Sequence, residues 1–449
     1  MAPPNTITVL EHCRVALPPD SVTQTSLPLT FFDLRWLRLP PVQTVFFYDY
    51  PHSKTHFIDS FLPKLKHSLS LTLQHFYPLA GNLIWPPESE NPFILSVTGD
   101  SVSFTIAESN TDFYHLSGNH ARNVTESHPL VPHLPISDTV ASVLALQVTV
   151  FSNGGFCIGI TMHHGVLDGQ SSAMFFKSWA SICRSGDSSL SPELVPFYDR
   201  SLIKDDPEGL EKVYSRPTES KTEFNNNRRS LVVMDCKAPP NSVRSTFELS
   251  RADIERLRKR VLEQTPLLHV STFVLTCAYT WVCLVRADLK NLRKKRICFV
   301  FAVDCRTRLD PPVPITYFGN CISCCMVHAK TCDVKGEDGL GIAVEEFYKV
   351  IRGLDNGVLI GMEKEIPADP SEEREAPFGI AWSNRFRVYE TDFGCGRPRK
   401  VEMISIDKSG AMSLLESRDG SGGVEIGLVL NKQEMEAFAS MFVNGLKAL

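Results

Sequence analysis

The most constraining feature of this sequence is a histidine pair placed where a strand gives way to a helix. Residues 143–150 and 156–161 have the apolar, β-branched pattern of two strands joined by a Gly-rich turn. Residues 171–183 then carry apolar side chains at helical spacing. This order predicts a strand–turn–helix unit whose corner presents His163 and His164 on rigid backbone.

A histidine at such a corner can do chemistry, because a neutral imidazole accepts a proton near pH 7. Asp168 follows His164 by four residues, and Gly165 and Gly169 allow a tight turn between them. This spacing favours one catalytic histidine with a nearby organising carboxylate. An HxxxD pattern is short, however, and also occurs by chance. The alternative that His163 and His164 are ordinary turn residues therefore stays open at this point.

Composition narrows the class of protein. The chain has 449 residues, of which 43% are hydrophobic and 22% charged, so we expect a globular protein of two domains. A net charge of -5 argues against a nucleic-acid surface. We find no run of about 20 apolar residues that would span a membrane. The 13 scattered cysteines and the lack of a secretion signal indicate free thiols in the cytoplasm.

The pattern along the chain predicts an N-terminal domain at 1–190, a crossover linker on the surface at 191–242, and a C-terminal domain at 243–449. The linker is rich in Ser, Pro, Asp and Asn. Further strands are expected at 7–15, 44–48, 93–106, 245–249, 297–306, 322–327, 400–406, 411–416 and 424–430. Further helices are expected at 55–76 (with Pro63 inside), 251–263, 269–286 and 431–446.

Metal and nucleotide chemistry have little support in the sequence. Cys321, Cys324, Cys325 and His328 have the short spacings of zinc ligands. Because residues 322–327 alternate like a strand, these side chains would face both sides of a sheet. The sequence contains no P-loop, GxGxxG, GxSxG or EF-hand pattern. We therefore expect neither a bound metal nor a bound cofactor.

Four motifs together resemble those of the plant BAHD acyl-CoA-dependent acyltransferases. HxxxD stands at 164–168, and DFGCG at 392–396 is similar to the DFGWG motif of that family. YPLAG at 77–81 is typical of the family, and YFGNC at 317–321 resembles the motif of the clade that acylates anthocyanin, flavonoid and other phenolic glucosides. The likeness spans nearly the whole chain. Within that clade, the sequence as a whole is most similar to malonyltransferases that act on flavonoid or isoflavonoid glucosides.

The resemblance implies a fold related to chloramphenicol acetyltransferase. It implies two α/β domains of similar size with mixed β-sheets and flanking helices, and a solvent channel at their interface with His164 midway. It also implies that Asp168 points away from the reacting atoms and pairs with Arg306 and Asn320. On the same basis, Asp392 would keep its loop in shape near the CoA side. Gly394 and Gly396 belong to that loop.

The activity implied is transfer of an acyl group, malonyl above all, from acyl-CoA to a sugar hydroxyl of a phenolic glucoside. His164 would act as general base in a ternary complex of a monomeric enzyme, with acyl-CoA as co-substrate. Hydrogen-bond donors at a helix N-terminus would bind a phosphate of CoA, and a malonyl carboxylate needs a cationic side chain. The candidates for CoA are Ser271 and Thr272, and those for the carboxylate are Arg35, Arg38, Lys177 and Arg244.

Three alternatives remain open. The donor could be an aromatic hydroxycinnamoyl-CoA, which would need an apolar slot in place of a cation. The HHxxxDG pattern at 163–169 also resembles the signature of peptide-synthetase condensation domains, although this chain leaves no room for a carrier domain. A relative that binds phenolics without catalysis is the third. Cys395 replaces the tryptophan of the DFGWG motif, and we expect a looser loop or weaker acyl-CoA binding as a result.

Overall fold

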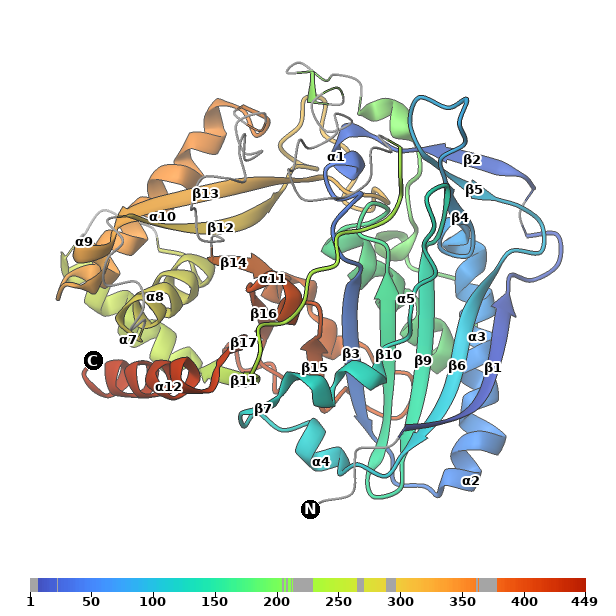
Figure 1. Ribbon diagram of the computed structural model, residues 1–449, viewed down its shortest axis with the longest axis horizontal. Coiled ribbons are helices and arrows are strands. Elements are labelled where there is room, and N and C mark those ends of the chain that lie inside the picture. Colours follow the sequence, from blue (N-terminus) through green and yellow to red (C-terminus); the bar gives the residue numbers. More distant parts are fainter. Residues whose placement is uncertain are drawn as a thin grey trace.

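The protein consists of two α/β halves that lie side by side (Figure 1). This computed structural model describes residues 7–449 except 22, 204–205, 207–208, 211, 213–228, 265–269, 288–295, 361 and 363–377. Each half has its own extensive hydrophobic core. The expected α/β class is therefore confirmed.

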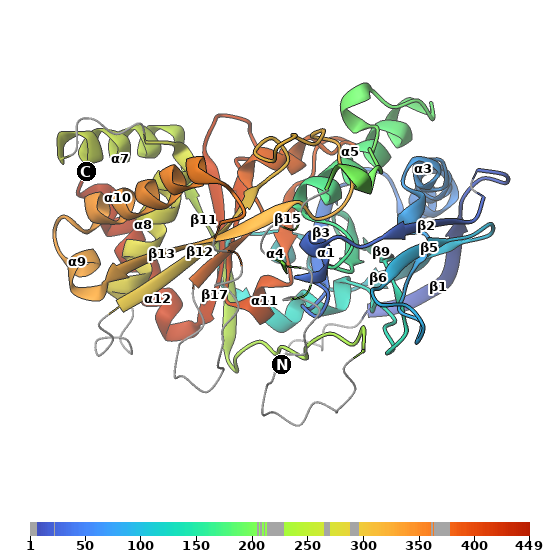
Figure 2. The same cartoon turned by 90° about the horizontal axis from the view of Figure 1, so that it is seen from above.

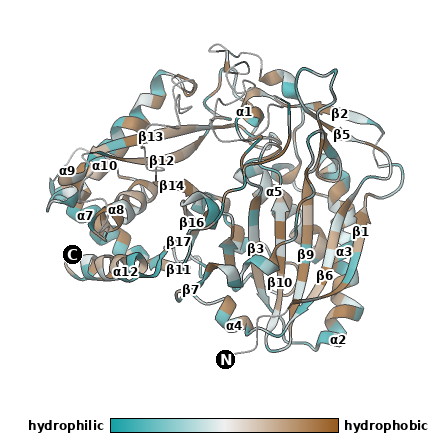
Figure 3. Cartoon of the chain, in the orientation of Figure 1, coloured by the Kyte–Doolittle hydropathy of each residue, from teal (hydrophilic) through white to brown (hydrophobic). Residues whose placement is uncertain are grey.

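The N-terminal half is built on a mixed sheet whose buried strands lead to the histidine corner. Its strands β9 (Leu144–Phe151) and β10 (Gly155–Met162) are buried along their whole length, and Figure 3 shows hydrophobic colour along them. The helices α3 (Leu62–His75) and α5 (Gly169–Ser185) pack on one side of this sheet (Figure 2). In spatial order, the strands are β1 (Ile7–Ala16), β6 (Ser101–Ser109), β9 (Leu144–Phe151), β10 (Gly155–Met162), β3 (Val42–Asp49) and β15 (Lys400–Met403).

A smaller antiparallel sheet lies beside the N-terminal sheet. Its strands in order are β2 (Thr25–Pro28), β5 (Phe93–Ser96), β4 (Asn82–Ile84) and β8 (Val140–Ser142). The short helix α1 (Phe31–Leu34) follows β2, and its four residues are buried. The remaining short helices of this half are α2 (Lys54–His56) and α4 (Phe113–Leu116).

The C-terminal half contains a second mixed sheet with helices packed against it. The packing helices are α7 (Arg251–Gln264), α8 (Thr272–Ala287), α10 (Gly339–Gly353) and α12 (Lys432–Lys447), and α9 (Thr331–Lys335) and α11 (Ile406–Ser409) are shorter. In order, the strands are β13 (Ile322–Lys330), β12 (Arg296–Asp304), β14 (Phe378–Ala381), β16 (Met412–Glu416), β17 (Val424–Asn431), β11 (Ser242–Leu249) and β7 (Arg122–Asn123).

The two large sheets exchange strands. β15 comes from the C-terminal part of the chain but pairs with β3, with Val401 opposite Phe46. β7 comes from the N-terminal part but pairs with β11, with Arg244 opposite Arg122. Neither pairing can be predicted from the sequence, because short strands leave little periodicity and partner choice depends on tertiary contacts.

The helix expected at 55–76 is present but has a wider turn in front of its proline. After α2, residues Phe57–Phe61 form a π-helical turn, and α3 then starts with Pro63 in its first turn. Proline lacks the N–H that a helix interior would use, and a first turn does not need that donor. The apolar spacing was therefore a sound guide to the helix, and the proline determines where its regular part begins.

Most other expected elements are confirmed, with two differences. Residues 93–106 form β5 and β6 rather than one strand, because a turn at 97–100 sends them into different sheets. The strand expected at 400–406 ends at Met403, and the backbone N–H groups of Ile404 and Ser405 both donate to the carbonyl of Gln43. For the helix expected at 269–286, His269 lies outside the described residues.

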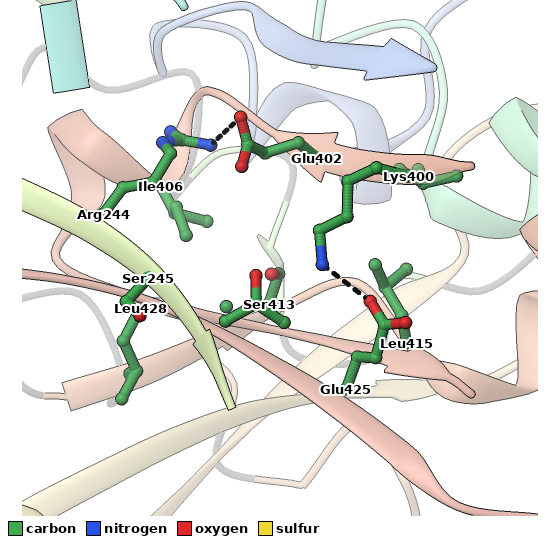
Figure 4. Close-up of a pocket in the computed structure, with 12 residues that line it drawn as sticks. Arg244, Ser245, Lys400, Glu402, Ile406, Ser413, Leu415, Glu425 and Leu428 are labelled. Atoms are coloured by element: carbon green, nitrogen blue, oxygen red, sulfur yellow. Dashed lines mark hydrogen bonds and ion pairs between the residues drawn. The ribbon is translucent and has the colours of Figure 1, made fainter. Parts of the chain in front are cut away.

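Buried charges join the two sheets where β15 meets the C-terminal half. Lys400 and Glu402 are two residues apart on β15 and therefore point to the same side. Lys400 Nζ lies 2.8 Å from a Glu425 oxygen on β17, and Arg244 of β11 lies 3.2 Å from Glu402 (Figure 4). Arg122 also pairs with Glu402. We call this set the central ion cluster: Arg122, Arg244, Lys400, Glu402, Asp407 and Glu425, all at most 5% exposed.

None of the described helices is long and apolar enough to cross a membrane.

The central ion cluster predicts a specific loss of stability in acid. Burial raises the pKa of Glu402, but the charges of Arg122 and Arg244 outweigh it and lower the pKa from 4.5 to about 2. Because the folded pKa is the lower one, Glu402 stabilises the protein above about pH 4.5 and loses this effect as pH falls towards 2. Glu402→Gln should lower the free energy of unfolding at pH 7 by about 3–5 kcal/mol, since it leaves the buried Arg122 without its carboxylate partner and removes one of the two carboxylates that bind Arg244.

The measurement is the urea midpoint of wild type and Glu402→Gln between pH 7 and pH 2. The variant should lose less of its remaining stability across the acid range than wild type does. Glu436→Gln, a change at an exposed residue of α12, is the matched control and should stay within about 0.5 kcal/mol of wild type. Parallel curves for wild type and Glu402→Gln would contradict the assignment.

Candidate active site

The predicted strand-to-helix corner is present, and backbone bonds fix both of its sides. β10 ends at Met162, and the N–H of His163 donates to the carbonyl of Val143 at 2.9 Å. Asp168 is the N-cap of α5, where its carboxylate accepts the N–H of Ser171 at 3.0 Å. The turn carrying His164 is thus held between the end of a buried strand and the start of a buried helix.

His164 is half-buried, and its ring is stacked on an indole. Its imidazole lies 4.4 Å from the ring of Trp36, centroid to centroid, with 9° between the planes. The Nδ1 atom is buried without a hydrogen-bond partner, which leaves Nε2 as the nitrogen available to a substrate. The backbone carbonyl of His164 accepts the side-chain amide of Asn320 at 2.9 Å. The ring is therefore held by Trp36 and the backbone by Asn320.

The two histidines differ in surroundings and in role. Burial lowers the pKa of the His164 imidazole, although Asp168 and Asn320 oppose this effect. Burial and the neighbouring His164 lower the pKa of His163 to about 4. His163 is fully buried, and its Nδ1 accepts the N–H of Gly165 at 3.1 Å. His164 is thus the member of the pair that can meet a substrate, and His163 is structural.

Asp168 is bound by other protein groups and is buried. Its oxygens accept both terminal nitrogens of the Arg306 guanidinium at 2.8 and 3.1 Å. They also accept the N–H groups of Ser171 and Cys321, at 3.0 and 3.1 Å. This carboxylate anchors α5 to the segment after β12, as the resemblance implied, and its charge is matched by Arg306.

Asn320 does not pair with Asp168, and this part of the expectation is wrong. Its backbone N–H and its side-chain amide both donate to Asp33, at 2.9 and 3.0 Å. The other Asp33 oxygen accepts Arg200 at 2.6 Å. Asp168 is already filled by Arg306 and two backbone donors, so Asn320 bridges Asp33 to the His164 carbonyl instead.

Gly319 makes room for this second buried ion pair. A Cβ atom at residue 319 would lie 2.7–2.9 Å from three atoms of the Arg200 guanidinium. The φ angle of Gly319 is 142°, in a region that favours glycine. The glycine of the YFGNC motif is therefore required by both the backbone and its neighbour.

The DFGCG loop is closed by its own aspartate. Asp392 Oδ1 accepts the N–H groups of Gly394 and Gly396 at 2.7 and 2.9 Å, and both glycines have positive φ. Phe393 is buried against Trp179 with ring centroids 4.8 Å apart. The loop is thus shaped by Asp392 and packed on α5, and its proposed place near CoA stays a prediction.

Cys395 occupies the position of the family tryptophan. Its side chain is half-buried and packs against the N-terminal core. Burial raises the pKa of this thiol to about 12, so it stays protonated and acts as a small apolar group. The expected effect of the missing ring on acyl-CoA binding stays a prediction.

Comparison with known proteins identifies the family. The model of the Transferase family matches residues 6–444. Phenolic glucoside malonyltransferase 2 of Arabidopsis thaliana is 43% identical, over 98% of this chain and 99% of that protein. The chain is also 42% identical to the malonyl-CoA:anthocyanidin 5-O-glucoside-6''-O-malonyltransferase of the same plant, with 98% of each covered. The crystal structure of vinorine synthase aligns with a TM-score of 0.71 at 20% identity, covering 96% of each chain.

The chain belongs to this family, the BAHD acyltransferases. The resemblance seen in its four motifs is thereby confirmed, and the likeness to vinorine synthase supports the expected fold. The channel between the halves stays a prediction.

The candidates for CoA binding in this BAHD acyltransferase have other contacts within the C-terminal half. Ser271 Oγ accepts the N–H of Val274 at 3.3 Å and so caps α8. Thr272 Oγ1 accepts Arg258 of α7 at 3.3 Å. These bonds give both hydroxyls a structural task, and their contact with CoA stays a prediction.

The four cationic candidates for a malonyl carboxylate lie in different surroundings. The expectation that Arg244 binds the carboxylate is corrected, because Arg244 is buried in the central ion cluster and bound to Glu402 and Asp407. Lys177 on α5 is 3.7 Å from Glu390. Arg35 lies over the indole of Trp36, with its guanidinium carbon 5.8 Å from the centroid of the ring.

Arg38 is two residues beyond Trp36, and its backbone carbonyl accepts the N–H of Met234 at 2.8 Å. Burial lowers the pKa of the Arg38 guanidinium. Of the two, Arg35 is the one whose guanidinium lies over the indole that stacks on His164.

Among the residues that the structure describes, no group of three or more His, Cys, Asp and Glu side chains is arranged to hold a metal ion. Cys324 and Cys325 are consecutive on β13 and lie opposite Ala302 and Phe301 of β12. Their side chains therefore point to opposite faces of the sheet, as the alternating pattern predicted.

Sequence reasoning missed Asp33, Trp36 and Arg200. Asp33 did carry a signal, because a lone carboxylate between phenylalanines and leucine needs a buried partner. Arg200 carried none, since it lies in the segment expected to be a surface linker and yet is only 8% exposed. Trp36 carried no signal of its own, because its role depends on a stacking contact with His164 that no local pattern shows.

The close contact between Gly319 and Arg200 predicts that a side chain at residue 319 lowers stability. Gly319→Ala should lower the free energy of unfolding by about 1–3 kcal/mol, because the backbone strain and the contact with Arg200 both oppose the added methyl. Urea unfolding measures the change. Gly353→Ala is the control: it ends α10, has nothing within 4 Å of an added Cβ, and should be neutral or slightly stabilising. Equal behaviour of the two variants would refute the requirement.

Proposed function

We propose that this BAHD acyltransferase transfers a malonyl group from malonyl-CoA to a sugar hydroxyl of a flavonoid, isoflavonoid or other phenolic glucoside. His164 is the general base, and both substrates bind before the reaction. The observation that carries the assignment is the geometry of His164. Its imidazole is half-buried with Nδ1 buried, and its backbone carbonyl is held by Asn320. The identities of 43% and 42% to malonyltransferases of phenolic and anthocyanidin glucosides support the choice of substrates.

The reaction needs one base and no covalent enzyme intermediate. His164 Nε2 removes the hydroxyl proton while the sugar oxygen attacks the thioester carbonyl, so a C–O bond forms and a tetrahedral intermediate results. When the intermediate collapses, the C–S bond breaks and the CoA sulfur takes the proton from the imidazolium. Base catalysis of this kind supplies about 10²–10⁴-fold. Holding both substrates together supplies a further large share.

The surroundings of His164 suit this role. A pKa lowered by burial keeps the imidazole neutral and able to accept a proton at neutral pH. Asp168 is occupied by Arg306 and backbone donors, so it acts as an anchor for the corner. The proton therefore passes between substrate and His164 alone.

Release of CoA from malonyl-CoA with a flavonoid glucoside acceptor tests the assignment. We expect His164→Ala to lower kcat by about 10²–10⁴-fold, since it removes the base. His67→Ala, the same change at an exposed histidine of α3, should leave kcat unchanged. A fully active His164→Ala variant would remove the mechanism. A wild-type protein that binds the glucoside but releases no CoA from any donor would favour the non-catalytic alternative.

Arg35 is the proposed partner of the malonyl carboxylate, because its guanidinium lies over the indole that stacks on His164. We expect Arg35→Gln to raise the KM for malonyl-CoA about tenfold or more, because a charge-assisted hydrogen bond to the carboxylate is lost. The KM for acetyl-CoA, which lacks that carboxylate, should change little. Lys177→Gln is the control and should preserve the ratio of the two constants. Preference of wild type for coumaroyl-CoA in direct competition would decide for the aromatic donor.

A further inference from the structure

Trp36 is the only ring whose stacking on His164 is recorded among the described residues. The planes of the two rings are 9° from parallel, with centroids 4.4 Å apart. The indole is half-buried, and its Nε1 atom is buried without a hydrogen-bond partner. Such a face-to-face contact fixes the tilt of the imidazole, which the bond between Asn320 and the backbone carbonyl does not.

The backbone around Trp36 is built for this close approach. A Cβ atom on Gly165 would lie 3.0 Å from Leu37 Cα, so only glycine beside His164 lets the segment come this near. On the other side of the turn, the N–H of Trp36 donates to the carbonyl of Asp33 at 3.0 Å. Asp33 also receives both bonds from Asn320, the residue that holds the His164 carbonyl. One segment therefore controls the ring and the backbone of the histidine.

We propose that Trp36 is a positioning residue for the acyl transfer: its indole holds the His164 ring in the orientation for proton removal and stabilises the imidazolium that forms. The inference rests on the proposed role of His164 as base. The π-face of an indole attracts a cation, and His164 carries a positive charge only after it has taken the proton. The stacking is thus stronger in the transition state than before it, which is the condition for a contribution to kcat.

The two carboxylates near His164 are each matched by a buried arginine. Asp168 is matched by Arg306, and Asp33 by Arg200. His163 is neutral at pH 7, because burial lowers its pKa to about 4. The groups that face His164 or the residues packed on it are His163, Asp168, Arg306, Asp33, Arg200 and Arg35.

Two substitutions at residue 36 distinguish the effect of the aromatic ring from that of apolar bulk. Trp36→Leu keeps an apolar side chain but removes the π-face, and Trp36→Phe keeps a ring. We expect Trp36→Leu to lower kcat by about 3- to 30-fold, with the KM values for donor and acceptor within about threefold of wild type. Trp36→Phe should keep most of the kcat. Thermal melting should show both variants folded.

The pH profile supplies a readout that a merely structural role would not change. Because leucine preserves burial and loses the π-face, the pKa of His164 in Trp36→Leu should be lower than in wild type. The acid limb of the kcat profile should move to lower pH accordingly. The same shift should appear in the NMR titration of the His164 ring, whose signal is assigned by its absence in His164→Gln.

The outcomes distinguish this inference from the proposed function. If His164→Ala stays active, the role of His164 fails, and the NMR titration still tests the contact with Trp36. If His164→Ala is inactive while Trp36→Leu matches wild type in kcat and in the titration, only the inference about Trp36 is overturned. Equal losses in Trp36→Leu and Trp36→Phe would also overturn it, because the ring would then not matter.

Discussion

The buried pair of Asp168 and Arg306 is the interaction on which the turn carrying His164 depends. Both side chains are fully or almost fully buried, so each would be costly without the other. Arg306 also donates to the carbonyls of Tyr317 and Gly319. The pair therefore fixes the start of α5 and the YFGNC segment together. Asp33 and Arg200 repeat the arrangement on the other side of Asn320, which links the second pair to His164.

These buried ion pairs position chain segments more than they add to the free energy of unfolding. A buried ion pair gains little over well-packed apolar groups, but it specifies one geometry closely and is costly to break. In the active site that geometry is the backbone of His164. In the central ion cluster it is the placement of β15 against β11 and β17. Both clusters join chain segments that are more than 100 residues apart, and both lie where the two halves meet.

The sequence predicted the elements well and their partners poorly. Strands β9 and β10, helix α5 and the capped helix α12 follow from periodicity and local caps, which act over a few residues. The HxxxD corner was recognised for the same reason. The π-turn before Pro63, the split of 93–106 between two sheets and the partners of Asn320 depend on tertiary packing. No local pattern could show that Arg200, in a segment rich in polar residues, is buried against Asp33.

The position of β15 affects how the chain can fold as it is synthesised. β3 lies between β10 and β15, so its outer edge is completed only by residues 400–403. A nascent chain folding from its N-terminus would expose that edge until residues 400–403 had left the ribosome. Its backbone donors and acceptors would be open to other strands during this time. The emergence of β15 is therefore the step at which the exposed edge of the N-terminal sheet is covered.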